Sequence, residues 1–429
     1  MAQERKFWDP IVETMPLDKL RKLQGERLQE AVTHAYEKSA LYRRKFDAVG
    51  IKPSDIKGVE DIAKLPLTED AEIRGTPFSE KLAIPLEQVK MFHSTSGTTT
   101  GVPEPVPFNQ KSMDTFFYLE SRGRWTMGVR PWDVVQVLTQ FDCCFFGYKN
   151  LGATVVMLSA GRYRLDGQIR LTQSAGVTVL EHAPSLLLKY FERAQELGID
   201  IKKTKVRMVS GVGEGWAESY KRKVEAQYGF PFMTLWGSVE LGVASAECEA
   251  RGGMHIFSDL FLIEVIDPET LKPLPPGEEG EIVLTPLWCE AMPLIRYRIG
   301  DVAKILPYEP CPCGRTSPKM SMVKGRISHI VKVKGVKIMP IDVEEIAASI
   351  EGLAENYQIV VDKPGELERL KVKMEYKPEV SNLSALGNQA EEAFNRNLGI
   401  DAEIELLPIG SIVSTTFKAQ RVVTTYDKA

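Results

Sequence analysis

Segments with strand character and segments with helix character alternate through the middle of this sequence, and this alternation strongly limits the fold. Three short runs are rich in β-branched residues, at Asp133–Leu138, Ala153–Leu158 and Val177–Leu180. Helical periodicity occupies neighbouring stretches such as Pro184–Leu197 and Trp216–Tyr228. Strands that alternate with helices favour a mainly parallel sheet covered by helices. The stretch from about Lys90 to Thr285 is therefore predicted to be α/β.

The sequence changes character after Gly325. A Lys/Val alternation is followed by a predicted helix at about 341–350, a hairpin near 362–365, a helix near 384–397 and a last strand at 403–407. This pattern predicts a separate α+β unit of about 100 residues. Since a chain of 429 residues is too long for one ordinary core, we expect a large N-terminal body at 1–326 and a small mobile lid domain at 327–429.

Composition excludes some classes of protein. The formal net charge is −4 and Lys and Arg are not concentrated anywhere, which argues against nucleic-acid binding. The N-terminus lacks an apolar signal core and no later run is long enough to span a bilayer. We therefore expect a cytoplasmic protein with no membrane partner. In such a compartment the six cysteines would be thiols, metal ligands or nucleophiles rather than disulfides.

A loop rich in small hydroxyl residues is the first chemical motif. Phe92–Pro105 reads FHSTSGTTTGVPEP, with Gly97 and Gly101 among six Ser and Thr residues. Backbone N–H groups in such a loop can approach a polyphosphate closely while hydroxyls donate further hydrogen bonds. A flexible surface loop would have the same composition. The spacing does not match the Gly-Lys-Ser/Thr pattern of a Walker A loop.

The loop resembles the phosphate loop of the adenylate-forming superfamily, which includes acyl-CoA synthetases, peptide-synthetase adenylation domains and luciferases. Four further segments resemble motifs of that superfamily in the same order: LWGSVELG at Leu235–Gly242, YRIGD at Tyr297–Asp301, GRISHIVKVKGVKIMP at Gly325–Pro340 and SIVSTTFKAQRV at Ser411–Val422. The phenylacetate-CoA ligase group resembles the chain most, on the segments LQGERLQEAVTHAYEKSALYRRKF, VGEGWAE, ECEARGGMHIFSDLF, MPLIRYRIGD and CPCGR.

The resemblance implies roles for a set of residues. Asp301 would bind the ribose hydroxyls, with Arg326, or less favourably Arg315, reaching the ribose or phosphates. Glu240 would coordinate Mg²⁺ and Lys418 would be the catalytic cation that relieves charge repulsion during adenylation. The remaining nucleotide contacts would come from the phosphate loop and the turns near adenine: Ser94, Ser96, Gly97, Thr98, Thr99, Gly213, Glu214, Trp236, Gly237 and Ser238.

Cys248, His255, Cys311 and Cys313 are candidate zinc ligands. Cys311 and Cys313 form a tight Cys-Pro-Cys-Gly pair, and Cys248 and His255 form a second pair. Two loops that give two ligands each can make a closed structural Cys₃His site. Four unrelated side chains remain the alternative, but some relatives in the phenylacetate-CoA ligase group carry the same four positions.

The implied activity is an AMP-forming ligation of a small carboxylic acid to CoA with ATP and Mg²⁺, through an acyl-adenylate. Aromatic residues in QFDCCFFGYKN, namely Phe141, Phe145, Phe146 and Tyr148, suggest an aromatic acid, although a core segment would look the same. Departures from the superfamily pattern occur at Val102, Val239 and Ser328-His329. A deazaflavin-adenylating synthetase stays open as an alternative because such enzymes resemble the same branch. Val102 and Val239 also leave open a non-catalytic, zinc-stabilised nucleotide-binding protein. A homodimer is also expected.

Overall fold

The computed structural model describes residues 5–95, 103–138, 142–157, 165–362, 369–412 and 421–424. The largest sheet has eight strands in the order β14-β10-β9-β8-β7-β6-β4-β5. Its parallel half runs from β5 to β8 and its other pairs are antiparallel. The strands are β4 (Val134–Val137), β5 (Thr154–Val156), β6 (Val179–His182), β7 (Met208–Gly211), β8 (Phe232–Ser238), β9 (Gly242–Glu247), β10 (Met254–Ile256) and β14 (Lys319–Met320).

Helices connect and cover the parallel strands, as the alternation predicted. They are α6 (Gln110–Met127), α7 (Asp142–Leu151), α8 (Leu165–Ser174), α9 (Pro184–Glu196) and α10 (Glu218–Tyr228), with a 3₁₀ turn η4 (Ile201–Lys203). The side chain of Asn109 accepts from Ser112 N at the start of α6, and Gly128 ends the helix at φ 104°. From Leu119 to Met127 every residue of α6 is buried, so this helix lies inside the body rather than on its surface.

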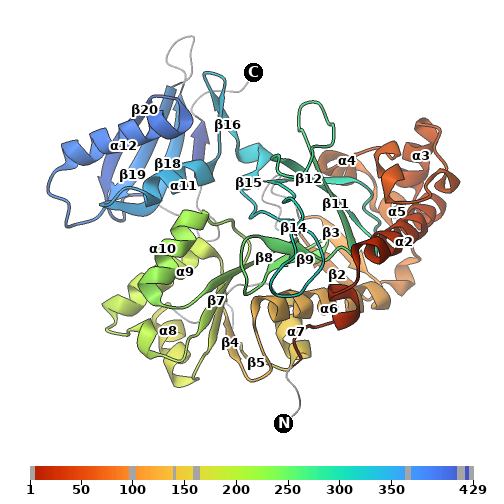
Figure 1. Ribbon diagram of the computed structural model, residues 1–429, viewed down its shortest axis with the longest axis horizontal. Coiled ribbons are helices and arrows are strands. Elements are labelled where there is room, and N and C mark those ends of the chain that lie inside the picture. Colours follow the sequence, from red (N-terminus) through yellow and green to blue (C-terminus); the bar gives the residue numbers. More distant parts are fainter. Residues whose placement is uncertain are drawn as a thin grey trace.

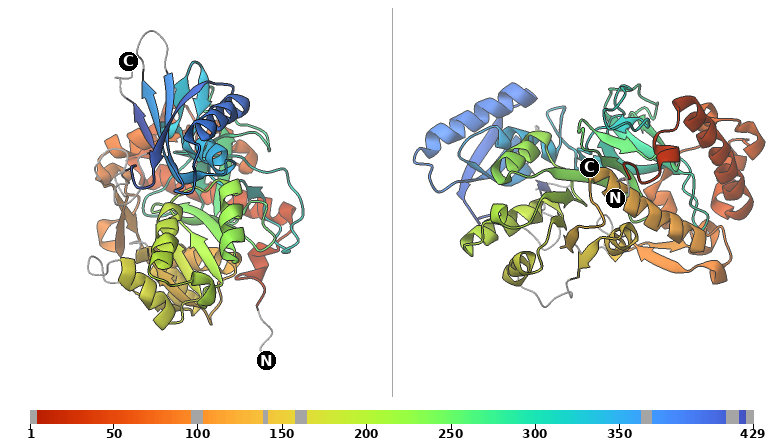
Figure 2. Two further views of the ribbon diagram at one scale, coloured as in Figure 1. Left: turned by 90° about the vertical axis from the view of Figure 1, so that its left-hand side faces the viewer. Right: turned by 60° about the horizontal axis from the view of Figure 1, so that its bottom comes forward.

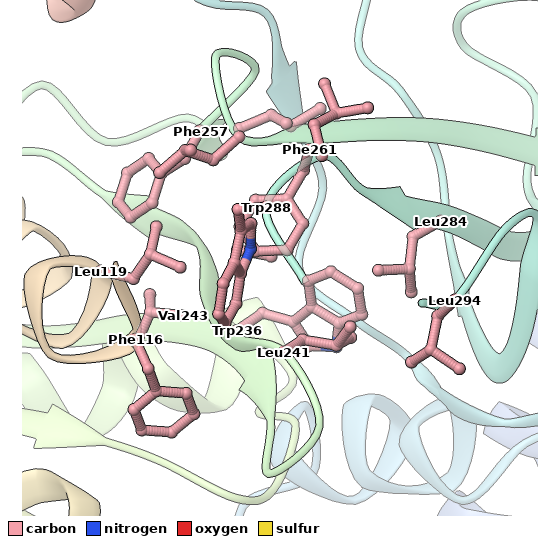
Figure 3. Packing of buried hydrophobic residues seen from close by; sticks show 14 of the residues in the cluster. Phe116, Leu119, Trp236, Leu241, Val243, Phe257, Phe261, Leu284, Trp288 and Leu294 are labelled. Carbon is pink, nitrogen blue, oxygen red and sulfur yellow. The ribbon is translucent and has the colours of Figure 1, made fainter. Parts of the chain in front are cut away.

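A second sheet packs beside the first. Its path is β1-β13-β12-β11, and β15 pairs with β13. The strands are β1 (Thr68–Glu69), β11 (Phe261–Ile266), β12 (Gly280–Pro286), β13 (Tyr297–Ala303) and β15 (Gly325–Arg326). Figure 3 shows Trp236 and Trp288 between Phe116 and Leu119 on one side and Leu284 and Leu294 on the other. One apolar core therefore joins α6, the large sheet and the second sheet.

The N-terminal segment consists of short helices and turns around two longer helices. The elements are α1 (Pro10–Glu13), α2 (Leu17–Lys38), α3 (Ala40–Ala48), η1 (Pro53–Asp55), η2 (Val59–Lys64), α4 (Asp70–Gly75), α5 (Phe78–Lys81) and η3 (Leu86–Gln88). The helical stretch from Leu17 to Ala48 is divided at Ser39, whose backbone is extended. A hairpin of β2 (Met91–Ser94) and β3 (Pro105–Phe108) follows, and it flanks the predicted phosphate loop.

The C-terminal part is an α+β unit with its own buried cluster. Its sheet has the order β20-β19-β18-β21, and a small hairpin of β16 and β17 precedes it. Figure 1 and Figure 2 show this unit, in blue, standing over α10 and apart from the N-terminal helices. Its elements are η5 (Ile327–His329), β16 (Val331–Val333), β17 (Val336–Ile338), α11 (Pro340–Ala348), β18 (Leu353–Asp362), β19 (Arg369–Tyr376), α12 (Leu383–Leu398), β20 (Ala402–Pro408) and β21 (Val422–Thr424).

The architecture confirms the predicted α/β body and smaller α+β C-terminal domain. The expectation that strand 403–407 would be the last was wrong, because β21 follows it and pairs in parallel with β18. Among the described residues, no helix combines the length and the apolar character that crossing a membrane requires.

Candidate active site

A cavity of about 1590 Å³ lies between the body and the C-terminal domain. The body contributes the carboxyl ends of the parallel strands, where ligands of open α/β sheets usually bind. The C-terminal domain contributes Glu344, Tyr357 and Arg421. With the exception of Arg315, every described residue that the sequence assigned to the nucleotide or to Mg²⁺ lines this cavity: Ser94, Gly213, Glu214, Trp236, Gly237, Ser238, Glu240, Asp301 and Arg326.

Asp301 is held from two sides. The indole Nε1–H of Trp236 donates to Asp301 Oδ2 at 2.9 Å, and Arg326 Nε donates to Asp301 Oδ1 at 3.1 Å. The pairing of β15 with β13 places Arg326 directly opposite Asp301. A carboxylate fixed in this way keeps lone pairs for further donors such as vicinal hydroxyls.

At two positions of the cavity wall the backbone geometry leaves room only for, or strongly favours, glycine. A Cβ on Gly237 would lie 2.1 Å from the carbonyl oxygen of Gly242, so no other residue fits between β8 and β9. Gly213 follows β7 with φ +80°, in the left-handed region that favours glycine. The turn that it makes exposes Glu214 on the cavity wall.

Polar groups also face the cavity near the predicted phosphate position. Ser94 ends β2, Glu240 lies in the turn after β8, and Ser238 Oγ is a buried hydroxyl without a hydrogen-bond partner among the described residues. The loop residues Ser96, Gly97, Thr98 and Thr99 and the predicted catalytic Lys418 lie outside the described residues. Their assigned roles stay predictions.

A buried ionic cluster on the cavity wall was missed by the sequence reasoning. Arg124 NH1 and NH2 donate to Glu120 Oε2 at 2.6 Å and to Glu181 Oε1 at 2.9 Å. Tyr148 and Ser210 donate their hydroxyls to Glu181 Oε2 at 2.5 Å and 2.8 Å. The available signals were the glutamate inside the apolar strand VLEH and the closely spaced charged residues of LESRGRW.

Burial and charge shift the pKa values of this cluster in opposite directions. Burial raises the pKa of Glu120. Burial also acts on Glu181, but the Arg124 charge and the Tyr148 hydrogen bond outweigh it and lower the pKa of that carboxyl. Burial lowers the pKa of neighbouring His182 to about 4, so this imidazole is neutral at pH 7.

Three of the aromatic residues expected in the acyl pocket, Phe145, Phe146 and Tyr148, do not line the cavity. Phe146 stacks on Phe117 with ring centroids 4.4 Å apart, and Tyr148 is buried against Arg124. Of the described residues in QFDCCFFGYKN, Cys144 lines the cavity. Phe141 lies outside the described residues. The described part of the segment belongs to helix α7 (Asp142–Leu151), and the rings of Phe146 and Tyr148 pack against α6 residues instead of lining the cavity.

The four candidate zinc ligands converge away from the cavity. Their ligand atoms all lie within 4.8 Å of one another and all four residues are buried. Cys248 Sγ lies 3.7 Å from Cys311 Sγ, and Cys313 Sγ lies 3.3 Å from His255 Nε2. A tetrahedron with Zn–S bonds of about 2.3 Å has edges of about 3.8 Å, so the spacing fits such an ion.

The surroundings of this cluster also suit a metal. His255 Nδ1 lies 3.1 Å from the carbonyl oxygen of Ser317. A hydrogen bond there places the proton on Nδ1 and directs the Nε2 lone pair toward the thiols. Arg315, an alternative nucleotide contact in the sequence prediction, instead donates to the buried carboxylate of Glu13 at 2.7 Å. That expectation for Arg315 was wrong.

The C-terminal domain brings one titratable group into the interface. Ala217 N donates to Glu344 Oε1 at 3.4 Å across the boundary between α10 and α11. Burial raises the pKa of Glu344 to about 7, and nearby Arg421 opposes this shift. The carboxyl is therefore half-protonated near neutral pH while the two domains are in contact.

Comparison with known sequences gives full-length relatives. Residues 16–286 match the family described as AMP-binding enzyme, and residues 335–425 match the AMP-binding enzyme C-terminal domain. A phenylacetate-coenzyme A ligase of Aromatoleum evansii is 34% identical over 96% of both chains. A phenylacetate-coenzyme A ligase of Escherichia coli strain K12 is 32% identical, again over 96% of both chains.

Comparison with solved structures gives the same architecture. A 2-hydroxyisobutyryl-CoA ligase in the postadenylation state with 2-HIB-AMP has a TM-score of 0.90 at 24% identity, over 99% of this chain and 93% of that one. The ligase of that name in the thioesterification state, with 2-HIB-AMP and CoA, has a TM-score of 0.72 at 26% identity, over the same shares. The present arrangement of body and C-terminal domain is closer to the former.

Proposed function

Because the chain belongs to the family of AMP-binding enzymes, we propose that it joins a small aromatic carboxylic acid to CoA. It is an AMP-forming acid–CoA ligase that works through an acyl-adenylate and uses ATP and CoA. In the first half-reaction the carboxylate attacks the α-phosphate of ATP and pyrophosphate leaves. In the second, the CoA thiol attacks the acyl carbon and AMP leaves.

The observation that carries this proposal is the convergence of Trp236, Asp301 and Arg326 on one cavity. We assign Asp301 to the ribose hydroxyls, since its two oxygens are oriented by donors from two other strands, β8 and β15. The indole of Trp236 and the turn at Gly213 and Glu214 would flank adenine, because a flat ring and exposed carbonyls suit a purine.

We assign the polyphosphate to the side of the cavity that holds Ser94, Ser238 and Glu240. The unpartnered Ser238 hydroxyl can donate to a phosphate oxygen. Glu240 would hold Mg²⁺, which needs few protein carboxylates because it keeps most of its waters. Ser96, Gly97, Thr98, Thr99 and Lys418 complete the proposed set, with Lys418 supplying the cation that stabilises the transition state of adenylation.

We place the boundary between the body (1–326) and the lid domain (327–429) at η5. The domain would rotate about Ser328 between the two half-reactions, which lets one small unit serve adenylation and then thiol entry. The Ser328-His329 pair lines the cavity at this junction. Serine offers only neutral contacts there, so the restraint on rotation is weak.

We propose a structural zinc ion at Cys248, His255, Cys311 and Cys313. The spacing and the Ser317 contact support it, and zinc would supply folding stability rather than chemistry at the active site. A homodimer and a cytoplasmic location stay predictions from the sequence.

Pyrophosphate release with a panel of aryl and arylacetic acids, with and without CoA, tests the proposed reaction. Acid-dependent pyrophosphate release together with CoA-dependent AMP release and thioester product is expected. AMP transfer to a deazaflavin without any use of CoA would favour the synthetase alternative. Nucleotide binding without pyrophosphate release for any acid would favour a non-catalytic protein.

A further inference from the structure

One wall of the cavity is built from charged and polar side chains. Glu120 and Arg124 of α6, Cys144 of α7 and His182 at the end of β6 all line it. Glu120 is 5% exposed and Arg124 is 1% exposed. Such groups are removed from water yet lie against an open cavity, so whatever fills the cavity becomes part of their surroundings.

The charges on this wall do not cancel. Arg124 is the cation between the carboxylates of Glu120 and Glu181, which leaves an excess of one negative charge when both are ionised. Both oxygens of Glu181 are occupied, since Oε1 accepts from Arg124 and Oε2 accepts from Tyr148 and Ser210. Glu120, which faces the cavity, is therefore the carboxylate that gains from a further donor.

Two nitrogen atoms of this wall lack a hydrogen-bond partner in the described part of the chain, so the hydrogen-bond network of the wall is incomplete. Arg124 Nε and His182 Nδ1 are among the buried polar atoms of the described residues that have no hydrogen-bond partner. Buried N–H groups without partners are rarer than bare acceptors, so we assign the His182 proton to Nε2. His182 then offers an N–H donor on the same cavity wall as the acceptor Glu120.

The position of the wall identifies the part of the substrate that meets it. Trp236 and Asp301 mark the nucleotide side of the cavity, on β8 and β13. The wall is formed by α6, α7 and the end of β6, where the carboxyl groups of Glu120 and Glu181 share the single guanidinium of Arg124 and leave it no free charge for a phosphate. In an enzyme that makes an acyl-adenylate, this part of the cavity is left for the acyl group.

We infer that the acid carries a hydroxyl group at the end remote from its carboxylate, and that the Glu120–Arg124–His182 wall selects it. This inference rests on the proposed function. A hydroxyl can donate to a carboxylate such as Glu120 and can accept from an N–H such as that of His182, so it suits either group of this wall. A plain phenyl ring would cover both groups without bonding them, and a second carboxylate would find no unpaired cation among the described residues of this wall.

Matched acids test this preference in the wild-type enzyme. Thioester formation is measured with benzoate, phenylacetate, their 2-, 3- and 4-hydroxy derivatives and the methyl derivatives of the same positions. A methyl group has nearly the size of a hydroxyl but forms no hydrogen bond. The best hydroxy acid should exceed both its parent and its methyl analogue in kcat/KM by about tenfold or more. Equal or lower values for every hydroxy acid would overturn the inference.

The variant Glu120→Gln tests the residue. It keeps the side-chain size and a hydrogen-bonding oxygen for Arg124 but removes the charged acceptor. The hydroxyl preference should fall about tenfold, while KM for ATP stays unchanged. The matched control is Glu247→Gln, which neutralises an equally buried carboxylate paired with Lys221 at 2.5 Å, away from the cavity lining. An equal loss of preference in both variants would refute a specific role for Glu120.

Two further measurements test the hydroxyl preference if Glu120→Gln does not fold or if no acid is turned over. If Glu120→Gln does not fold, His182→Phe, which leaves the ionic cluster intact, should lower the same preference, and an unchanged preference would refute the inference. Calorimetric binding of each acid to the wild-type protein gives the comparison without turnover. Turnover of the parent acids without a hydroxyl preference would refute the inference about the hydroxyl group but leave the proposed function standing. Absence of turnover with every acid would refute the proposed function, and the binding data would still decide the hydroxyl preference.

Discussion

Asp301 shows how a single residue is prepared for a ligand before that ligand arrives. Trp236 and Arg326 come from different strands, yet each donates to a different oxygen of this carboxylate. Holding the carboxylate in one rotamer lowers the entropy lost when a nucleotide binds. The indole therefore acts through its N–H as well as through its flat ring.

Trp236→Phe separates these two contributions. The variant keeps an aromatic ring in the cavity but removes the hydrogen bond to Asp301. Since a hydrogen bond to a charged group contributes about 1.5–3 kcal/mol, we expect KM for ATP to rise roughly tenfold or more with a smaller change in kcat. Trp288→Phe is the control, because Trp288 is buried in the same core and its Nε1 has no partner among the described residues. Equal KM increases in both variants would contradict the assignment.

Lys418→Ala tests the proposed catalytic cation. Charge develops at the α-phosphate only during adenylation, so acyl-AMP formation should fall by about two to three orders of magnitude. CoA transfer from acyl-AMP supplied in advance should be nearly unchanged. Quenched-flow assays of each half-reaction distinguish these effects, and equal losses in both would exclude the assignment.

The sequence predicted those secondary-structure elements whose own residues show a clear strand or helix pattern. Strand β6 and helix α9 were predicted close to their observed bounds because β-branched residues and helical periodicity mark them. The break between α2 and α3 was not predictable, because Ser39 Oγ donates to the carbonyl oxygen of Glu80 from a distant segment. The charged wall was missed for the same reason, since Arg124 and Glu181 are far apart in sequence.

The Cys/His cluster links the β9–β10 hairpin to the loop before β14. Cys248 follows β9, His255 lies in β10, and Cys311 and Cys313 belong to the loop before β14. Spacing in the sequence predicted which residues would be ligands, and the antiparallel pairing of β10 with β14 brings the two pairs together. A metal ion here would fix a long loop to the end of the large sheet.

Loss of one ligand should therefore remove both the metal and stability. The purified protein is expected to contain about one zinc per chain by mass spectrometry of metals. Cys311→Ser should lose that zinc and lower Tm by roughly 5–10 °C, because structural zinc contributes to the free energy of folding. Cys289→Ser, a partly buried thiol outside the cluster, is the matched control. Protein that lacks zinc and melts at an unchanged temperature after Cys311→Ser would contradict the site.

For the whole molecule, the contact between the body and the C-terminal domain depends on protonation. The pKa of Glu344 is raised to about 7 when α11 lies against α10, mainly by burial. Its ordinary pKa is 4.5, so the contact favours the protonated carboxyl. The contribution to docking is fully present below pH 4.5 and is lost as the pH rises through 7.

Docking of the C-terminal domain should weaken about tenfold between pH 6 and pH 8. Glu344→Gln, which stays neutral, should abolish this dependence and keep the domains together at pH 8. Fluorescence energy transfer between dyes on the two domains measures the docked fraction. Exposed Glu351→Gln in the same domain is the control and should behave as the wild type. A pH profile that is identical in wild type and Glu344→Gln would assign the dependence to another group.

The charged wall also limits how heat-resistant this chain can become. Replacing a buried ionic cluster with apolar residues of similar volume is often neutral or stabilising, whereas removing one partner alone is strongly destabilising. Directed evolution for thermal endurance alone should therefore replace Glu120, Arg124 and Glu181 together rather than singly. The resulting proteins would have a higher thermal stability and would accept apolar acids more readily. Thermal stability and substrate specificity are therefore expected to trade off in this protein.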